Sequence, residues 1–229
     1  MKLNETGWNS PPNKEKSMTE EMGDDHIAGS ANTPLRPDAF ELDDEIKIEL
    51  IAKHFKEIMQ VLGLDLEDDS LKGTPQRVAK MYVKEIFSGL NPKNMPEARM
   101  FENRYQYNQM LVERDITFHS SCEHHFVPII GRAHVGYISS GKVIGLSKIN
   151  RIVQHFAKRP QVQERMTVQI AEALKEALQT EHVAVVVDAA HLCVQMRGIQ
   201  DINSRTVTSQ FLGKFKEDGF RQEFLKYIE

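Results

Sequence analysis

The chain of 229 residues has few cysteines, no long apolar run and no excess of positive charge. Two cysteines are too few for a disulfide framework, and we expect a cytoplasmic protein without structural disulfides. No apolar stretch could span a bilayer, and the N-terminal "MKLNETGWNSPPNKEKS" lacks the apolar segment of a signal peptide. The net charge of -4 disfavours general nucleic-acid binding but is compatible with a local basic pocket.

The N-terminal third predicts a tail followed by helices. Residues 1–40 are polar and aperiodic, which is typical of a mobile tail whose role the sequence does not reveal. From Asp43 an apolar stripe predicts an amphipathic helix that Gly63 would end; the stripe comprises Ile48, Ile51, Ala52, Phe55, Ile58, Met59 and Leu62. "TPQRVAKMYVKEIF" predicts a second helix, with Thr74 as N-cap and Pro75 in its first turn. We therefore expect a helical region over residues 41–108.

Residues 109–229 predict strands and helices in alternating blocks. Strand patterns cover 110–120, 126–139, the "GKVIGL" that follows a Ser-Gly turn, a valine-rich stretch over 182–196, and its hairpin partner over 204–213. Two helices lie between them, "SKINRIVQHFAKR" with Ser147 as a possible cap and "QERMTVQIAEALKEALQ". This order predicts an α+β domain with a mostly antiparallel sheet.

Two short stretches carry candidate metal ligands. In "SSCEHHFVP", Cys122 and His125 are three residues apart, so one turn can offer both side chains to an ion, although chance also produces such pairs. In "HLC", His191 and Cys193 would share one face of a strand; the alternative is a buried histidine beside an inert cysteine.

Taken together, these stretches give a set of three ligands, Cys122, His125 and Cys193. A catalytic zinc site keeps one position open for water, whereas a structural site is normally closed by four protein ligands. His124, which we expect to point elsewhere from the same turn, and His191 are then left for proton transfer. Sulfur ligands favour zinc, which lowers the pKa of bound water and so favours attack on carbon. Glu123 is expected to tie down the turn.

A third group of residues suggests an anion-binding pocket. Ser147, Lys148 and Arg151 lie at a predicted helix start, where free backbone N–H groups favour anions. Arg77, Lys80 and Arg197 would complete a polyphosphate pocket, although exposed lysines and arginines are more often simply solvated. Glu164, which follows Gln163, could accept hydrogen bonds from a guanine-like base edge, or could simply be a favourable charge at a helix start.

The motifs resemble those of GTP cyclohydrolase I of the zinc-dependent type. The resemblance runs in order from about residue 45 to the C-terminus through "TPQRVAKMY", "SSCEHHFVPIIGRAHVGYI", "GLSKINRIVQHFAKRPQVQERMT" and "HLCVQMRG". It implies a tunnelling fold, an antiparallel sheet with helices on one face after a helical N-terminal region. It also implies a homodecamer with active sites at subunit interfaces. The expected reaction is hydrolysis and rearrangement of GTP to 7,8-dihydroneopterin triphosphate and formate, the first step of folate and pterin synthesis.

The resemblance also implies roles for individual residues. By motif, the zinc ligands are Cys122, His125 and Cys193, and His124 and His191 are the catalytic histidines, with Ser147 as a further proton carrier. Glu164 anchors guanine, with Gln163 beside it. The remaining residues contact ribose or triphosphate: Ser147, Lys148, Arg151 and Arg197, with Arg77 and Lys80 supplied by a neighbouring subunit. The expected chemistry is protonation of guanine nitrogen 7, followed by attack of zinc-activated water on carbon 8.

Two other functions remain open from the sequence. A related tunnelling-fold enzyme, such as a nitrile reductase or a pterin synthase, would share the glutamate but not the Cys-Glu-His-His and His-x-Cys pattern. A zinc-stabilised module that sequesters a nucleotide would have a fourth protein ligand and no spare histidines. Feedback regulation and a disulfide between Cys122 and Cys193 after metal loss cannot be inferred from the sequence.

Overall fold

The computed structural model describes residues 30–97 and 100–229, so most of the predicted tail lies outside the described residues. Residues 31–40 include a turn in which Ala39 N–H donates to Arg36 O, and Lys47 Nζ donates to Ala39 O. The proposed boundaries near residues 41 and 109 stay predictions. Among the described residues, no helix has both the length and the apolar character needed to cross a membrane.

The N-terminal helices begin and end close to the predicted positions. Helix α1 spans Asp44–Val61, Asp43 caps it by accepting from Ile46 N–H at 2.9 Å, and Gly63 follows its end with a φ of +79°. Helix α2 spans Thr74–Met81, and its N-cap is Gly73. The prediction that Thr74 is the N-cap was therefore wrong, because the helix begins one residue earlier.

Short helical turns continue from α2. A π-helical turn, η1, covers Tyr82–Ile86, and two 3-10 turns follow, η2 over Ser88–Leu90 and η3 over Pro92–Asn94. The predicted helix "TPQRVAKMYVKEIF" is thus α2 extended by a π turn rather than one regular α-helix.

The main sheet has five strands in the order β5-β2-β3-β6-β7. Their bounds are β2 Met110–Cys122, β3 Pro128–Ile138, β5 Pro160–Gln161, β6 Val183–His191 and β7 Thr206–Phe211. The neighbours β2/β3, β3/β6 and β6/β7 are antiparallel, whereas the short β5 runs parallel to β2, so the sheet is mixed at one edge. Strands β1 (Met100–Glu102) and β4 (Lys142–Ile144) pair separately as a two-stranded ribbon.

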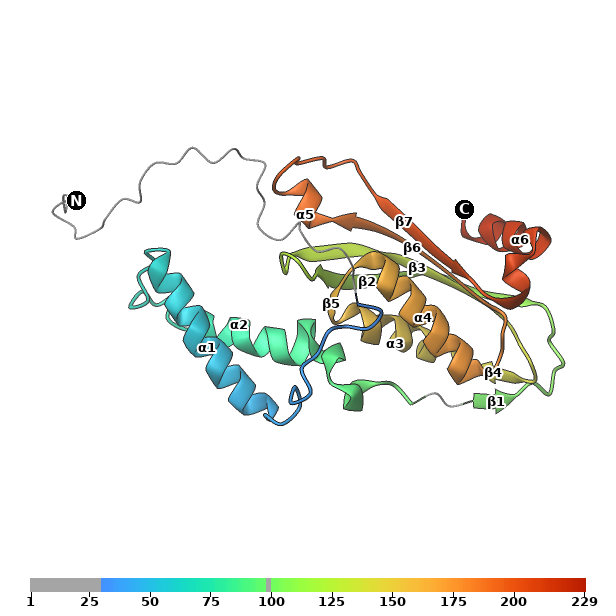
Figure 1. The fold of residues 1–229 in the computed structure, drawn as a ribbon, viewed down its shortest axis with the longest axis horizontal. Helices are drawn as coiled ribbons and strands as arrows, with labels where there is room; N and C mark the ends of the chain where they lie inside the picture. Colours follow the sequence, from blue (N-terminus) through green and yellow to red (C-terminus); the bar gives the residue numbers. More distant parts are fainter. Residues whose placement is uncertain (1–29, 98–99) are drawn as a thin grey trace. The chain divides into compact units, whose positions relative to one another are not determined.

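Helices α3 (Leu146–Ala157) and α4 (Gln163–Leu178) cover one face of the sheet (Figure 1). Val183, Val185 and Val187 of β6 are fully buried in the core that these helices share with the sheet. On the opposite face, Ala184 and Val186 pack with Phe215 of η4 (Gly213–Lys216) and Phe224 of α6 (Asp218–Ile228). The expected α+β class with N-terminal helices is confirmed, and α6 adds cover to the second face.

The sequence overestimated the length of the valine-rich strand. Strand β6 ends at His191, and the chain then turns into a short helix, α5, over Leu192–Gln195. His191 and Cys193 therefore do not share a strand face, and the alternation argument for them was wrong. Ser147 is likewise not a cap, because it is the second residue of α3 and Gly145 occupies the N-cap position.

Candidate metal and active site

A tight turn joins β2 to β3 and carries the first two candidate ligands. Cys122 N–H donates to Val127 O at 2.9 Å, and Phe126 N–H donates to Cys122 O at 2.8 Å. Phe126 takes a left-handed φ of +55°, which lets the chain reverse within five residues. The turn leaves Cys122 buried at the end of β2 and His124 and His125 exposed beyond it.

The sheet register brings the second stretch to this turn. Ser121 pairs with Pro128, and Ile129 pairs with His191, so the ends of β2, β3 and β6 lie next to one another. Cys193, in the first turn of α5, then comes close to Cys122. The two stretches meet, as the sequence predicted, but through a strand end and a helix rather than through one strand face.

Cys122, His125 and Cys193 form a donor cluster that could hold a metal ion. One ligand atom from each residue lies within 4.8 Å of the other two. Burial, and next the neighbouring Cys122 thiol, raise the pKa of Cys193 to about 11. Thiolate with imidazole is a donor set that suits tetrahedral zinc. The residues present therefore fit zinc.

The two turn histidines differ in their second neighbour. Nδ1 of His124 and Nδ1 of His125 both lie 3.8 Å from Cys122 Sγ, while their rings are nearly perpendicular, at 82°. Only His125 is also close to Cys193. His124 Nε2 lies 3.9 Å from a Glu123 carboxylate oxygen. Proximity to Cys193 therefore separates the candidate ligand from the candidate proton carrier.

Arg197 lies directly against the cluster. Its Nη1 donates to His125 Nε2 at 2.9 Å. A neutral imidazole that accepts at Nε2 carries its proton on Nδ1, so it has no lone pair left for a metal. Metal binding by His125 and this hydrogen bond therefore exclude each other, and a bound metal would release Arg197 to find another partner.

His191, at the end of β6, is held from α4. Its Nε2 lies 2.7 Å from Gln163 Oε1. Burial lowers the pKa of His191, and the nearby Glu164 carboxylate partly opposes this effect. His191 is thus held mainly neutral, which suits a group that must accept a proton near neutral pH.

The remaining predicted substrate residues are distributed over three helices, α2, α3 and α4. Glu164 is exposed on α4, next to His191, whereas the side chain of Gln163 is buried and already hydrogen-bonded. Ser147, Lys148 and Arg151 occupy the first turns of α3, and Arg77 and Lys80 are exposed on α2. Within residues 30–97 and 100–229, no hydrogen bond or ion pair joins these α2 and α3 side chains to the donor cluster. Of the predicted phosphate contacts, the structure brings only Arg197 to the cluster.

Arg165 anchors the Cys-Glu-His-His turn, and its role was not predicted from the sequence. Glu123 N–H donates to Gln161 O at 3.1 Å, and the Glu123 carboxylate pairs with Arg165, whose side chain is only 4% exposed. Glu123 does tie down the turn, as expected. The available signal was Arg165 itself, an arginine one helical turn before Gln169 on the buried face of α4.

The family model described as GTP cyclohydrolase I matches residues 51–229. The chain is 62% identical over 214 residues to GTP cyclohydrolase 1 of Flavobacterium johnsoniae, which covers 93% of this chain and 96% of that protein. It is 56% identical over 203 residues to GTP cyclohydrolase 1 of an Enterobacter species, covering 88% and 91% of the two chains.

A solved structure is also similar. The archaeosine synthase QueF-Like in the apo form matches with a TM-score of 0.37 and 20% identity, over 46% of this chain and 92% of that chain.

Proposed function

The chain belongs to the GTP cyclohydrolase I family and converts GTP to dihydroneopterin triphosphate, and we propose the following roles for its residues in this reaction. Cys122, His125 and Cys193 would hold a zinc ion. The observation that carries this assignment is the cluster of their ligand atoms within 4.8 Å; His124 lies beside Cys122, and His191 ends the strand that precedes Cys193. A zinc ion held there would supply water of lowered pKa for hydrolysis.

The two other histidines move protons in this proposal. Protonation of guanine nitrogen 7 makes carbon 8 electrophilic, and His124 or His191 can deliver that proton. Water addition at carbon 8 then opens the imidazole ring, and a second hydrolysis releases formate. During the later ribose rearrangement and ring closure, the histidines and Ser147 would carry protons between the sugar and the freed amine.

The charged residues would bind the two ends of GTP. Glu164, exposed at the start of α4 beside His191, would accept hydrogen bonds from the guanine edge. Ser147, Lys148 and Arg151, at the start of α3, would contact ribose and phosphates, together with Arg197 once it leaves His125. Arg77 and Lys80 are exposed on α2. In a homodecamer they would contact the phosphates of GTP bound at a neighbouring subunit.

The experiment follows formate and pterin formation from GTP with purified full-length chain. We expect activity with zinc, loss of activity after chelation, and recovery when zinc is restored. Cys193→Ser should lose both bound zinc and formate release. Full formate release by Cys193→Ser with zinc still bound would contradict the three-ligand assignment.

A further inference from the structure

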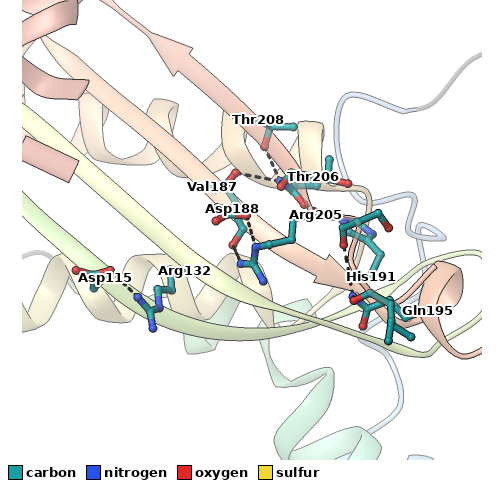
Figure 2. Close-up of polar contacts among 12 residues, drawn as sticks. Asp115, Arg132, Val187, Asp188, His191, Gln195, Arg205, Thr206 and Thr208 are labelled. Atoms are coloured by element: carbon teal, nitrogen blue, oxygen red, sulfur yellow. Dashed lines mark hydrogen bonds and ion pairs between the residues drawn. The ribbon is translucent and has the colours of Figure 1, made fainter. Parts of the chain in front are cut away.

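The carboxamide of Gln163 is enclosed by two strands and His191. Gln163 is the first residue of α4 and is 1% exposed. Its Nε2 donates to Thr206 O at 2.9 Å and to Val187 O at 3.1 Å, and lies 3.1 Å from Thr208 Oγ1. Figure 2 shows these three acceptors gathered where β6 and β7 run side by side. Both ends of the amide are therefore occupied, since its oxygen faces His191.

The surrounding groups fix which way this amide points. Thr167 Oγ1 donates to Gln163 O at 2.8 Å and lies 2.7 Å from Thr208 Oγ1. Because the Thr167 proton is used at Gln163 O, Thr208 must donate to Thr167, and a lone pair of Thr208 Oγ1 is left for the amide nitrogen. A reversed amide would place its oxygen against three acceptors. The oxygen Oε1 must therefore face His191 Nε2 at 2.7 Å.

We propose that Gln163 is a positioning residue that keeps a proton on Nε2 of His191, so that His191 exchanges protons with the substrate only through Nδ1. An amide oxygen can only accept, and a neutral imidazole has a single N–H, so that N–H must be at Nε2. Within the described part of the chain, the ring of His191 has no other hydrogen-bond partner. The proposal rests on the proposed function, because it takes His191 to be catalytic.

This arrangement has a consequence for the proton balance. Nδ1 accepts a proton from one reacting group and becomes N–H, while Nε2–H stays bonded to Gln163. The imidazolium then returns the proton from Nδ1 to the next group, and the ring is neutral again. With the other tautomer, Nδ1 would already carry the proton, and this exchange could not begin there.

The test compares two substitutions in the same buried spot of the zinc-loaded full chain. Gln163→Met removes the acceptor for Nε2–H, whereas Thr208→Val removes a hydroxyl that touches the amide but leaves Val187 O and Thr206 O to orient it. The tautomer is read by magic-angle-spinning NMR of protein labelled with ¹³C,¹⁵N-histidine, and the His191 signal is identified by its absence in His191→Ala. Thermal melting and zinc content of each variant show whether folding and the metal site are intact.

We expect wild type and Thr208→Val to hold His191 with the proton on Nε2, and Gln163→Met to lose that preference. Because the Gln163 amide is already bonded to Val187 O, Thr206 O and His191 and is not the guanine contact that the motif implied, Gln163→Met should lower kcat by about 10- to 100-fold with little change in KM for GTP, while Thr208→Val should stay within a few-fold of wild type. A proton on Nδ1 in wild type, or an unchanged kcat in Gln163→Met, would overturn the proposal. His191→Ala separates a failure of this proposal from a failure of the proposed function. Full activity in that variant would refute the catalytic role of His191 itself, whatever the result for Gln163→Met.

Discussion

At the scale of single residues, Glu123 has a role distinct from its neighbours in the Cys-Glu-His-His turn. Its carboxylate pairs with Arg165, whose Nε donates to Gln161 Oε1 at 3.0 Å. Gln161 is fully buried, and its amide donates in turn to Gln169 Oε1 at 2.9 Å. A connected set of polar groups thus runs from the buried face of α4 to the Cys-Glu-His-His turn, and the half-buried Glu123 is its last member.

Removing Glu123 should therefore cost far more than removing a surface charge. Glu123→Ala removes the Glu123 carboxylate from Arg165, whose side chain is only 4% exposed, and we expect a loss of about 3–5 kcal/mol in unfolding free energy. Because the same turn holds Cys122 and His125, the zinc content of the purified variant should fall as well. Urea unfolding at one protein concentration and metal analysis measure the two effects.

The matched control is Lys175→Ala, which breaks the exposed Lys175–Glu181 pair at 2.8 Å. Exposed pairs contribute about 0–1 kcal/mol, so this variant should unfold near the wild-type urea concentration and keep its zinc. Equal losses of unfolding free energy in the two variants would show that the Glu123–Arg165 pair stabilises the fold no more than an exposed pair does.

A second prediction at this scale concerns His155 and pH. Burial, and next the Arg159 guanidinium whose Nη2 lies 2.5 Å from His155 Nε2, lower the pKa of His155 to about 4, and a hydrogen bond to the Asn94 backbone partly opposes this. The folded state thus favours the neutral ring. Its contribution to stability is complete above the unfolded pKa of 6.5 and is lost as pH falls toward 4.

His155→Gln can still accept from Arg159 but cannot titrate. Between pH 7 and pH 4.5 the wild type should therefore lose more unfolding free energy than the variant, by about 2 kcal/mol. Urea midpoints of both proteins at the two pH values measure this difference, and carboxylates that titrate in the same range cancel in the comparison. Parallel losses would mean that His155 is not held neutral by the fold.

At the scale of elements, the sequence predicted strongly periodic segments well and a short one poorly. The stripe of α4 was correct because Ile170, Ala171, Leu174 and Leu178 repeat over about two and a half turns and are all buried. By contrast, "HLCVQM" alternates like a strand, yet Leu192–Gln195 form a four-residue helix with half-buried side chains. Four residues carry too little periodicity to reveal a turn that is imposed by the end of a sheet.

Another element-level feature is the close contact between η2 and the end of α3. Gly89 N–H donates to Lys158 O at 2.9 Å, and a Cβ at residue 89 would lie 2.1 Å from His155 O and 2.7 Å from Lys158 O. These neighbours are backbone atoms, which cannot move without shifting α3. The N-terminal helical turns can dock here only because residue 89 has no side chain.

Gly89→Ala should therefore destabilise the protein by about 1–3 kcal/mol or more, as overpacking of a tight contact does. The control is Gly219→Ala in α6, where an added Cβ meets nothing within 4 Å. That change should be neutral or stabilising by up to about 1 kcal/mol, because alanine has the higher helix propensity. Thermal melting of both variants provides the comparison, and a neutral Gly89→Ala would show that the contact between η2 and α3 can open without cost.

At the scale of the whole molecule, two predictions are not fulfilled within a single chain: the burial of the α1 stripe and the approach of Arg77 to the donor cluster. The apolar stripe of α1 predicted a buried face, yet Ile58 is 52% exposed and Leu62 is 71% exposed. Arg77 makes its side-chain hydrogen bonds within its own segment, to Ser70 O and Thr74 Oγ1, away from the donor cluster. A sequence pattern indicates that an apolar side chain will be buried or that a charged side chain will bind a ligand. It does not indicate which copy of the chain supplies the surface or the site.

Mixing inactive variants tests whether two copies build one site. If Arg77 and Lys80 act on the site of a neighbouring subunit, then Arg77→Ala/Lys80→Ala and Cys193→Ala damage opposite halves of that shared site. Oligomers that contain both variants in equal amounts should then recover activity at about a quarter of their sites, since each intact half is present with a chance of one in two. Dihydroneopterin triphosphate formation by the co-expressed, doubly tagged complex measures the recovery.

The control pairs Cys193→Ala with His191→Ala, which damage the same half, so that mixing should restore nothing. Recovery in the first pair and none in the second requires that Arg77 or Lys80 and the donor cluster of one site belong to different chains. If the doubly tagged complex contains both chains and still lacks activity in the first pair, each site draws its phosphate contacts from its own chain. Arg77 and Lys80 would then reach the phosphates only through a movement of α2 within their own subunit.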